Sequence, residues 1–127
     1  MGKQIITTAD APSSPLYSQG VRAGTALYVS GTPGIDPATG RPAGPTIGDQ
    51  TRQALRNCRA VLAAGGATPA DIVQVLVLLA DPGDFSGMNE AYAEAFPTDP
   101  PTRAVGRLGP ELPGLLVSIM MTAHVEG

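Results

Sequence analysis

The sequence predicts an α+β fold in a single domain spanning residues 1–127, with two helices covering one face of a mixed β-sheet. Two segments, 46–64 and 84–96, place apolar residues at three- and four-residue intervals, which is the period of an amphipathic helix. Between and around them lie short apolar runs bounded by Gly, Pro and Asp, which is typical of strands. A chain of 127 residues is long enough for a proper hydrophobic core.

The expected strands follow the chain in a simple order. Residues 3–7 form a short first strand, and 21–23 and 26–30 form a hairpin whose two-residue loop starts with Gly24, which suits a positive φ. Residues 72–80 are almost continuously apolar, which favours a strand covered on both faces, at the centre of the fold or at a subunit interface. A short strand at 102–105 and a long one at 115–125 complete the order, with a turn region at 108–114.

Each helix carries its own start and stop signals. Thr46 or Asp49 caps the first helix and Gly65-Gly66 ends it, whereas the second is capped near Asp84 and stops at Pro97. The apolar face of the second helix consists of Phe85, Met88, Tyr92 and Phe96. On the first helix Cys58 falls on the apolar side as a buried structural thiol. The opposite face carries Arg52, Arg56 and Arg59, whose helical spacing favours a solvated face over an anion site.

Composition excludes several classes of protein. The net charge of −3, without any run of Lys or Arg, argues against a nucleic-acid partner. The single cysteine excludes an internal disulfide and a thiolate metal cluster, and it fits a reducing compartment. No segment approaches the roughly 20 apolar residues that span a bilayer. We therefore expect a cytoplasmic protein without a membrane partner, and the charged fraction of only 15% favours burial of some surface against another subunit.

Few residues carry recognisable chemistry. His124 is the only histidine, so one chain can build neither a catalytic histidine pair nor a multi-histidine metal site, and we expect neither a metal nor a cofactor. Arg103 follows Pro100-Pro101 on a short strand, and its planar guanidinium matches a carboxylate or phosphate with two parallel hydrogen bonds. The alternatives for Arg103 are an ordinary surface arginine or an ion pair with one of the acidic residues.

The order and spacing of four segments resemble the reactive intermediate (imine/enamine) deaminase family of the RidA or YjgF type, along essentially the whole chain. The matching segments are Pro15-Leu16-Tyr17-Ser18-Gln19-Gly20, Leu27-Tyr28-Val29-Ser30-Gly31, Asp84-Phe85 with Met88-Asn89-Glu90-Ala91-Tyr92, and Pro101-Thr102-Arg103-Ala104-Val105. The resemblance implies a chorismate-mutase-like subunit. It also implies a homotrimeric, barrel-like assembly with clefts between neighbouring subunits.

The resemblance also implies an activity and a set of site residues. The reaction is the hydrolysis of a small enamine or imine acid, of the 2-aminoacrylate type, to a 2-oxo acid and ammonia. Arg103 anchors the substrate carboxylate, and backbone groups near it help to place water. The residues that match the family's substrate-binding positions are Tyr17, Ser30, Gly31, Asn89, Arg103, Ala104 and Val105.

This chain departs from the family pattern at three positions. Deaminating members commonly carry a glutamate on the last strand, whereas Ser118 stands in its place here, and a hydroxyl is a far poorer proton acceptor than a carboxylate. Val105 occupies a position that is often cysteine. Leu16 separates the usual Pro-Tyr pair, which affects the placement of Tyr17.

These departures keep other functions open. One alternative is a family member specialised for another small carbonyl or imine acid in a dedicated pathway. Another is a protein that binds a small carboxylate without turnover. The endoribonuclease label attached to some relatives is a further alternative, but acidity, a single histidine and scarce aromatic residues argue against it.

Overall fold

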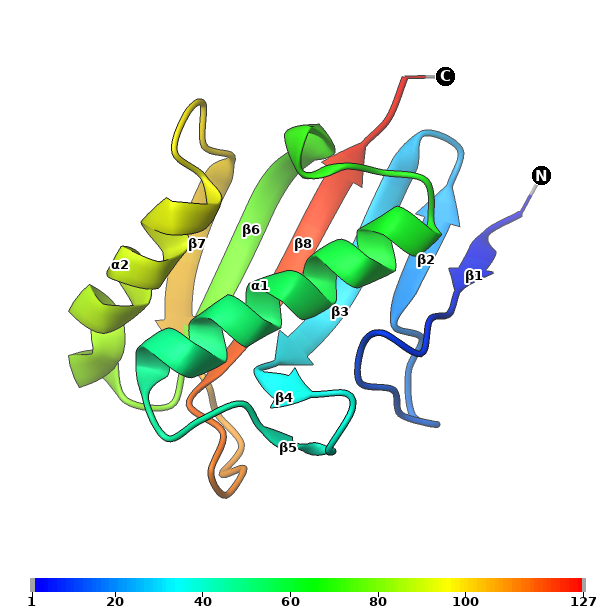
Figure 1. The fold of residues 1–127 in the computed structure, drawn as a ribbon. Coiled ribbons are helices and arrows are strands. Elements are labelled where there is room, and N and C mark those ends of the chain that lie inside the picture. Colours follow the sequence, from blue (N-terminus) through cyan, green and yellow to red (C-terminus); the bar gives the residue numbers. More distant parts are fainter. Residues whose placement is uncertain (1, 127) are drawn as a thin grey trace.

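A computed structural model describes residues 2–126, which form a six-stranded mixed sheet with two α-helices packed on it (Figure 1). The strand order across the sheet is β1-β2-β3-β8-β6-β7. The strands of this sheet are β1 (Gln4–Ile6), β2 (Gly20–Ala23), β3 (Ala26–Pro33), β6 (Ile72–Leu79), β7 (Thr102–Arg107) and β8 (Val117–His124). The remaining elements are β4 (Ile35–Asp36), β5 (Arg41–Pro42), the helices α1 (Ile47–Ala64) and α2 (Phe85–Ala95), and two 3₁₀ turns (Pro69–Asp71 and Pro82–Asp84).

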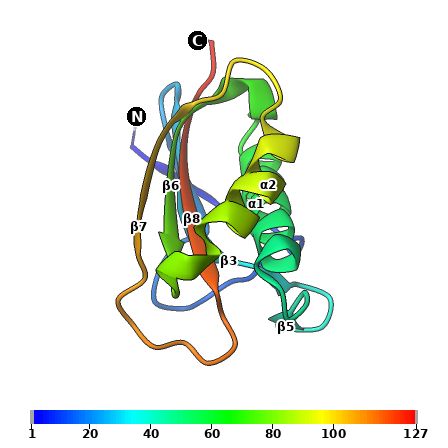
Figure 2. The same cartoon turned by 90° about the vertical axis from the view of Figure 1, so that its left-hand side faces the viewer.

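Both helices lie on the same side of the sheet, and no helix or strand formed by residues 2–126 packs on the other side (Figure 2). All neighbouring strands are antiparallel except β6 and β7, which pair in parallel. A parallel pair requires a crossover connection, and α2 lies in the connection from β6 to β7. The expected α+β class, with a mixed sheet and two helices on one face, is confirmed.

Local signals determine both ends of α1. Of the two predicted caps, Thr46 is the one used: its hydroxyl oxygen accepts a hydrogen bond from the backbone N–H of Asp49 at 3.1 Å. Gly65 closes the helix, and Gly66 follows with a φ of +93°, a conformation that favours glycine. The predicted hairpin turn is also confirmed, since Gly24 has a φ of +60° between β2 and β3.

The hydrophobic core lies between α1 and the helix-facing side of the sheet. Alternate residues of the central strands point into it, because side chains of a strand alternate between its two faces. On β8 the buried side chains are Val117, Ile119, Met121 and Ala123, and on β6 they are Ile72, Val75, Val77 and Leu79. Burying a Val, Leu, Ile or Met side chain contributes about 1.5–3 kcal/mol each. The core therefore fixes which face of each strand is turned away from the helices.

Two expectations require correction, and a third is only half met within one chain. Strand β6 is buried on its helix-facing side through Val75, Val77 and Leu79, whereas Leu76 and Leu78 on the other side are only half-buried, so the second face would be covered only at a subunit interface. Phe85 is 46% exposed and lies outside the core. The α2 start has no side-chain cap from Asp84; Asp81 instead accepts the N–H of Gly83 in the preceding 3₁₀ turn. The small β4–β5 hairpin was not predicted as strands.

Candidate functional site

One stripe of α2 surrounds the guanidinium of Arg103. Phe85, Asn89 and Tyr92 are spaced i, i+4 and i+7, so they share one helical face. The Nη1 of Arg103 donates to the Oδ1 of Asn89 at 2.7 Å. The guanidinium carbon lies 4.8 Å from the ring centroid of Tyr92 and 5.9 Å from that of Phe85. We call these four residues the arginine cradle.

The charge of Arg103 has no carboxylate partner within residues 2–126, where the ion pairs involve only Arg52. The side chain is exposed at the end of the cradle. A guanidinium carries five N–H donors in a fixed fork, and Asn89 uses only one edge of it. The predicted alternative of an internal ion pair is therefore not seen for Arg103 in this part of the chain. The remaining donors suit a planar anion such as a carboxylate.

Within residues 2–126, strand β7 lies at the end of the sheet and pairs only with β6, so one of its edges is free. The backbone N–H of Leu108 donates to Leu79 O at 2.8 Å, toward β6. Backbone groups of successive strand residues alternate between the two edges. By this alternation Ala104 faces β6, whereas Arg103 and Val105 turn their backbone N–H and C=O groups to the free edge. Val105 thus offers unpaired backbone groups two residues beyond the guanidinium.

A second group of predicted residues gathers where β3 meets β8. Ser30 donates from its Oγ to Ser18 O at 2.6 Å, and its backbone N–H donates to Gln19 O at 3.0 Å. The register of β3 against β8 shifts between Val29 and Thr32, which flanks this point. A Cβ added to Gly31 would lie 3.0 Å from the Ser118 Oγ, so these two residues are neighbours. We call Ser30, Gly31 and Ser118 the serine corner.

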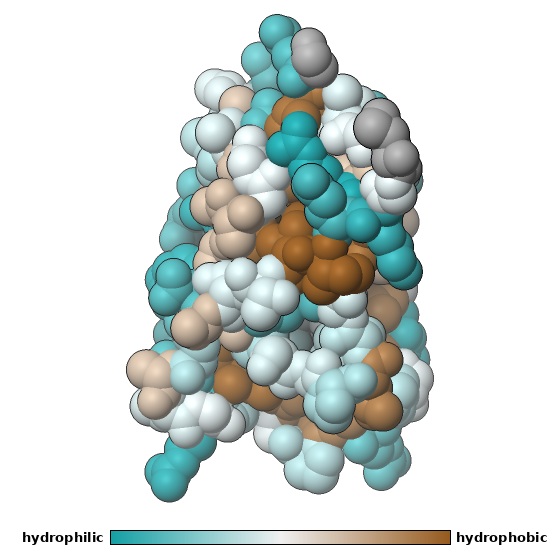
Figure 3. Space-filling view, turned by 90° about the vertical axis from the view of Figure 1, so that its right-hand side faces the viewer, coloured by the Kyte–Doolittle hydropathy of each residue, from teal (hydrophilic) through white to brown (hydrophobic). Residues whose placement is uncertain are grey.

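Tyr17 lies on the loop that hydrogen-bonds to Ser30. It forms an isolated bridge with Ser14, and half of its surface is exposed. Tyr17 lines a cavity of about 480 Å³ together with Ile5 and the loop 13–19. This side of the molecule shows a confined apolar patch among hydrophilic neighbours (Figure 3). Leu16, the residue that interrupts the family's Pro-Tyr pair, is 89% exposed and points to no partner in the core.

One chain does not bring the arginine cradle and the serine corner together. Ser30 lies on β3 and Arg103 on β7, with β8 and β6 between them. Adjacent strands are about 4.8 Å apart, so β3 and β7 are separated by about 14 Å. Arg103 also faces the helices, where it contacts Tyr92, whereas Ser118 alternates with the buried residues of β8 and faces the open side of the sheet. The predicted site residues therefore form two groups.

Sequence reasoning missed a glutamine that fixes the Tyr17 loop. Gln19 is only 6% exposed, and its Nε2 donates to the carbonyls of Thr8, Ala11 and Pro12 at 2.9–3.0 Å. Its Oε1 accepts the backbone N–H of Thr8 at 2.8 Å. All four bonds are to backbone groups up to 11 residues away, so no local pattern could have indicated them. Gln19 holds together the loop that carries Tyr17.

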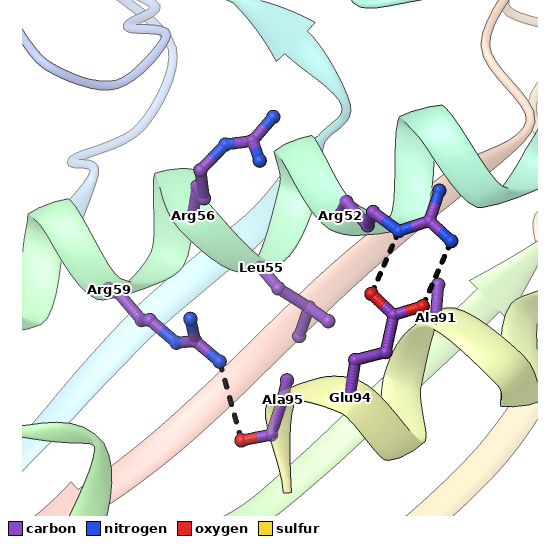
Figure 4. Close-up of a pocket in the computed structure, with 7 residues that line it drawn as sticks. All are labelled: Arg52, Leu55, Arg56, Arg59, Ala91, Glu94 and Ala95. Carbon is purple, nitrogen blue, oxygen red and sulfur yellow. Dashed lines mark hydrogen bonds and ion pairs between the residues drawn. The ribbon is translucent and has the colours of Figure 1, made fainter.

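The arginine row of α1 lines a groove of about 230 Å³ between α1 and α2 (Figure 4). Arg52 binds Glu94 through two hydrogen bonds of 3.0 and 2.9 Å, and Arg59 donates to Ala95 O at 3.4 Å. Arg56 points away from α2. Hydrogen bonding and charge from Arg52 lower the pKa of the Glu94 carboxyl. The expectation of a solvated side chain is therefore met by Arg56, whereas Arg52 and Arg59 link α1 to α2 through hydrogen bonds.

The remaining candidate groups lie apart from both clusters. Cys58 is buried, and desolvation raises the pKa of its thiol to about 12, which suppresses the nucleophilic thiolate. His124 lies at the exposed end of β8 within 3.3 Å of the Thr25 hydroxyl. Within residues 2–126 no three His, Cys, Asp or Glu side chains gather as a metal site would require. No helix of this range is long and apolar enough to cross a membrane.

The sequence and the structure both match known proteins along nearly the whole chain. Residues 8–125 match the family model described as endoribonuclease L-PSP. A RutC family protein of Pyrococcus horikoshii is 40% identical over 126 residues, which cover 98% of this chain and 99% of the relative. The 2-iminobutanoate/2-iminopropanoate deaminase of Homo sapiens is 37% identical over 103 residues, or 80% of this chain and 75% of the relative.

Among solved structures, E. coli TdcF with bound serine has a TM-score of 0.86 and 30% sequence identity, covering 97% of this chain and 99% of that one. The matches extend through both the arginine cradle and the serine corner, since they cover almost all of β3, β7 and β8. The earlier resemblance, drawn from four short segments, is thus confirmed over the length of the fold. The chain belongs to the endoribonuclease L-PSP family, which is the RidA/YjgF family of reactive intermediate deaminases.

Proposed function

We propose that this protein hydrolyses small imine or enamine acids to a 2-oxo acid and ammonia, with Arg103 as the anchor for the substrate carboxylate. The observation that carries the proposal is the arginine cradle: an exposed guanidinium oriented by Asn89 at 2.7 Å, without a carboxylate partner among residues 2–126. Relatives named as imino-acid deaminases support the reaction type. A relative with bound serine supports a small carboxylate as the ligand.

The reaction needs an anchored acid and one positioned water. Arg103 holds the carboxylate through two parallel N–H···O bonds. Water then adds to the carbon of the C=N bond, a proton passes to nitrogen, and the C–N bond breaks to release ammonia and leave a C=O group. An enamine enters this path once a proton on its carbon converts it to the imine. The edge-facing backbone groups of Val105 and the hydroxyl of Ser118 hold the water, while Ala104 keeps β7 in register.

The active unit in this proposal is a homotrimer whose clefts combine the arginine cradle of one copy with the serine corner of the next. Two observations support it. The residues that match one family site lie in two groups within a single chain, on opposite faces of the sheet. The face without helices also exposes apolar side chains, with Tyr28 at 51% and Met120 at 45%. Tyr17, Ser30 and Gly31 would then line the wall opposite Arg103.

The first test is turnover. An imino acid generated in situ by an amino-acid oxidase should be converted faster to 2-oxo acid and ammonia when the protein is present than in its absence. Arg103→Ala should abolish most of the acceleration, and Arg56→Ala, whose side chain points away from α2, is the matched control that should not. A parent protein that gives no acceleration over the uncatalysed hydrolysis would refute the proposed activity.

A specific observation favours one alternative, namely binding without turnover: the serine corner carries no carboxylate to accept a proton. Titration calorimetry with 2-oxobutanoate separates the two functions. Binding that requires Arg103, without any acceleration of imine hydrolysis, would establish a carboxylate-binding protein in place of a deaminase.

The trimer makes a separate prediction. Light scattering on a size-exclusion column should give about three times the subunit mass of 12.9 kDa.

If the clefts are shared, a mixture of Arg103→Ala and Gly31→Trp subunits, unfolded and refolded together, should recover part of the activity that each variant lacks alone. Some mixed trimers would pair an intact arginine cradle with an intact serine corner. A monomer at micromolar concentration, or active trimers without complementation, would contradict the shared cleft.

A further inference from the structure

We propose that Tyr92 is a positioning residue for Arg103, because its ring carries the guanidinium and determines which N–H donors face the substrate. The inference rests on the proposed function and adds a residue that the family motif around Arg103 does not include. Tyr92 was expected to serve only the core of the second helix. The structure places its ring centroid 4.8 Å from the guanidinium carbon.

The short distance from Tyr92 to the guanidinium and the burial of Tyr92 together allow its ring to support the guanidinium in a fixed position. A cation within about 6 Å of an aromatic centroid is attracted by the negative face of the ring. Tyr92 is only 7% exposed, and the ring of Phe96 packs against it with centroids 4.8 Å apart. The ring therefore has little freedom to move, whereas the guanidinium above it is exposed. Phe85 is more distant, at 5.9 Å, and half exposed, so its contribution is smaller.

The ring and Asn89 restrict the guanidinium in complementary ways. Asn89 holds Nη1 at one edge through a 2.7 Å hydrogen bond. The guanidinium carbon lies over the ring of Tyr92, 4.8 Å from its centroid, which limits movement of the guanidinium toward α2. With Nη1 held by Asn89 and the ring on one side, the edge formed by Nε and Nη2 remains for a carboxylate. That edge offers two parallel N–H donors, the geometry that a carboxylate binds best.

The hydroxyl of Tyr92 takes no part in this arrangement. It is buried and has no hydrogen-bond partner among the described residues. Desolvation raises the pKa of Tyr92, and the charge of Arg103 partly opposes this shift. A buried hydroxyl without a partner contributes no stabilising bond. The aromatic ring is therefore the functional part, and phenylalanine should replace it without loss.

Two substitutions test this division of roles. Tyr92→Phe keeps the ring and should bind 2-oxobutanoate within about twofold of the parent by titration calorimetry. Tyr92→Leu keeps an apolar side chain but loses the ring, and its Kd should rise by about 3- to 30-fold. In the imine assay Tyr92→Leu should raise KM more than it lowers kcat. Thermal melts identify any variant whose loss of binding comes from unfolding. A folded Tyr92→Leu protein with the parent's affinity, or a Phe variant as weak as the Leu variant, would overturn the proposal.

A direct readout keeps this test independent of the deaminase proposal. In ¹H–¹⁵N spectra the Nε–H of Arg103 should show a ring-current shift in the parent and in Tyr92→Phe, and the shift should vanish in Tyr92→Leu. If the parent neither binds 2-oxobutanoate nor hydrolyses imines, the proposed function fails. The spectra then still decide the positioning role: an unchanged Nε–H resonance in Tyr92→Leu would refute it, and a lost shift would support it.

Discussion

Replacing Ser118 with glutamate is expected to raise the rate of imine hydrolysis by about 10²–10⁴-fold, the usual contribution of a general acid–base group. A serine hydroxyl can hydrogen-bond the attacking water, but it is a poor proton acceptor, and the family resemblance leads us to expect a carboxylate at this position in deaminating members. Ser118 is partly buried and lies on the face of the sheet that no helix of residues 2–126 covers, so the longer side chain would extend away from the core. Affinity for 2-oxo acids should change little, because Arg103 remains the anchor.

The measurement is a coupled 2-oxo-acid assay on the parent, Ser118→Glu and Ser118→Gln. The glutamine variant matches glutamate in size but cannot accept the proton, so it should stay as slow as the parent. Thermal melts are needed alongside, because an unpaired charge buried at the serine corner would cost stability. A parent already as fast as glutamate-bearing relatives would show that Ser118 or an ordered water suffices. A well-folded but equally slow Ser118→Glu variant would point to another substrate.

Arg103→Lys is expected to weaken 2-oxo-acid binding by about 1–3 kcal/mol, or roughly 5- to 150-fold in Kd. Lysine keeps the positive charge but loses the planar fork, so it cannot donate to Asn89 along one edge and to a carboxylate along another. Its ammonium also lacks the planar surface that a guanidinium can present to the ring of Tyr92. Arg107→Lys is the matched control, since Arg107 is exposed on the same strand and lies outside the arginine cradle.

Titration calorimetry with 2-oxobutanoate measures both variants. Arg107→Lys should bind as the parent does, because its charge is conserved and it makes no contact with the arginine cradle. Equal affinity of the parent and Arg103→Lys would show that a point charge is enough, and the two-pronged anchor would then be wrong.

The helices and the early hairpin could be predicted from the sequence because their determinants are local. The cap at Thr46, the stop at Gly65-Gly66 and the spacing of apolar residues all lie within one element, so the expected limits of α1 differ from the observed ones by only a few residues. The turn at Gly24 has the same local character. Such signals do not depend on the partner against which the element packs.

The arrangement of the site could not be predicted in the same way. The separation of Ser30 from Arg103 follows from the strand order, in which β8, the last strand, lies between β3 and β6. The contact between Tyr92 and Arg103 depends on the path of α2 between two parallel strands, whereas the apolar period alone assigned Tyr92 to the core. Motif spacing nominated the candidate residues, but it carried no information on which of them meet within one chain.

The free edge of β7 has a consequence for solubility. An uncovered edge strand offers unpaired N–H and C=O groups with which another chain can pair, and proteins protect such edges with charged side chains and proline. Here Pro100-Pro101 precedes the strand, and Arg103 and Arg107 place exposed charges along it. The guanidinium proposed to bind substrate is thus also expected to hinder pairing of this edge with another chain. A neutral substitution at Arg103 would remove this charge together with the proposed anchor, so a charge-preserving variant gives the cleaner measurement of binding.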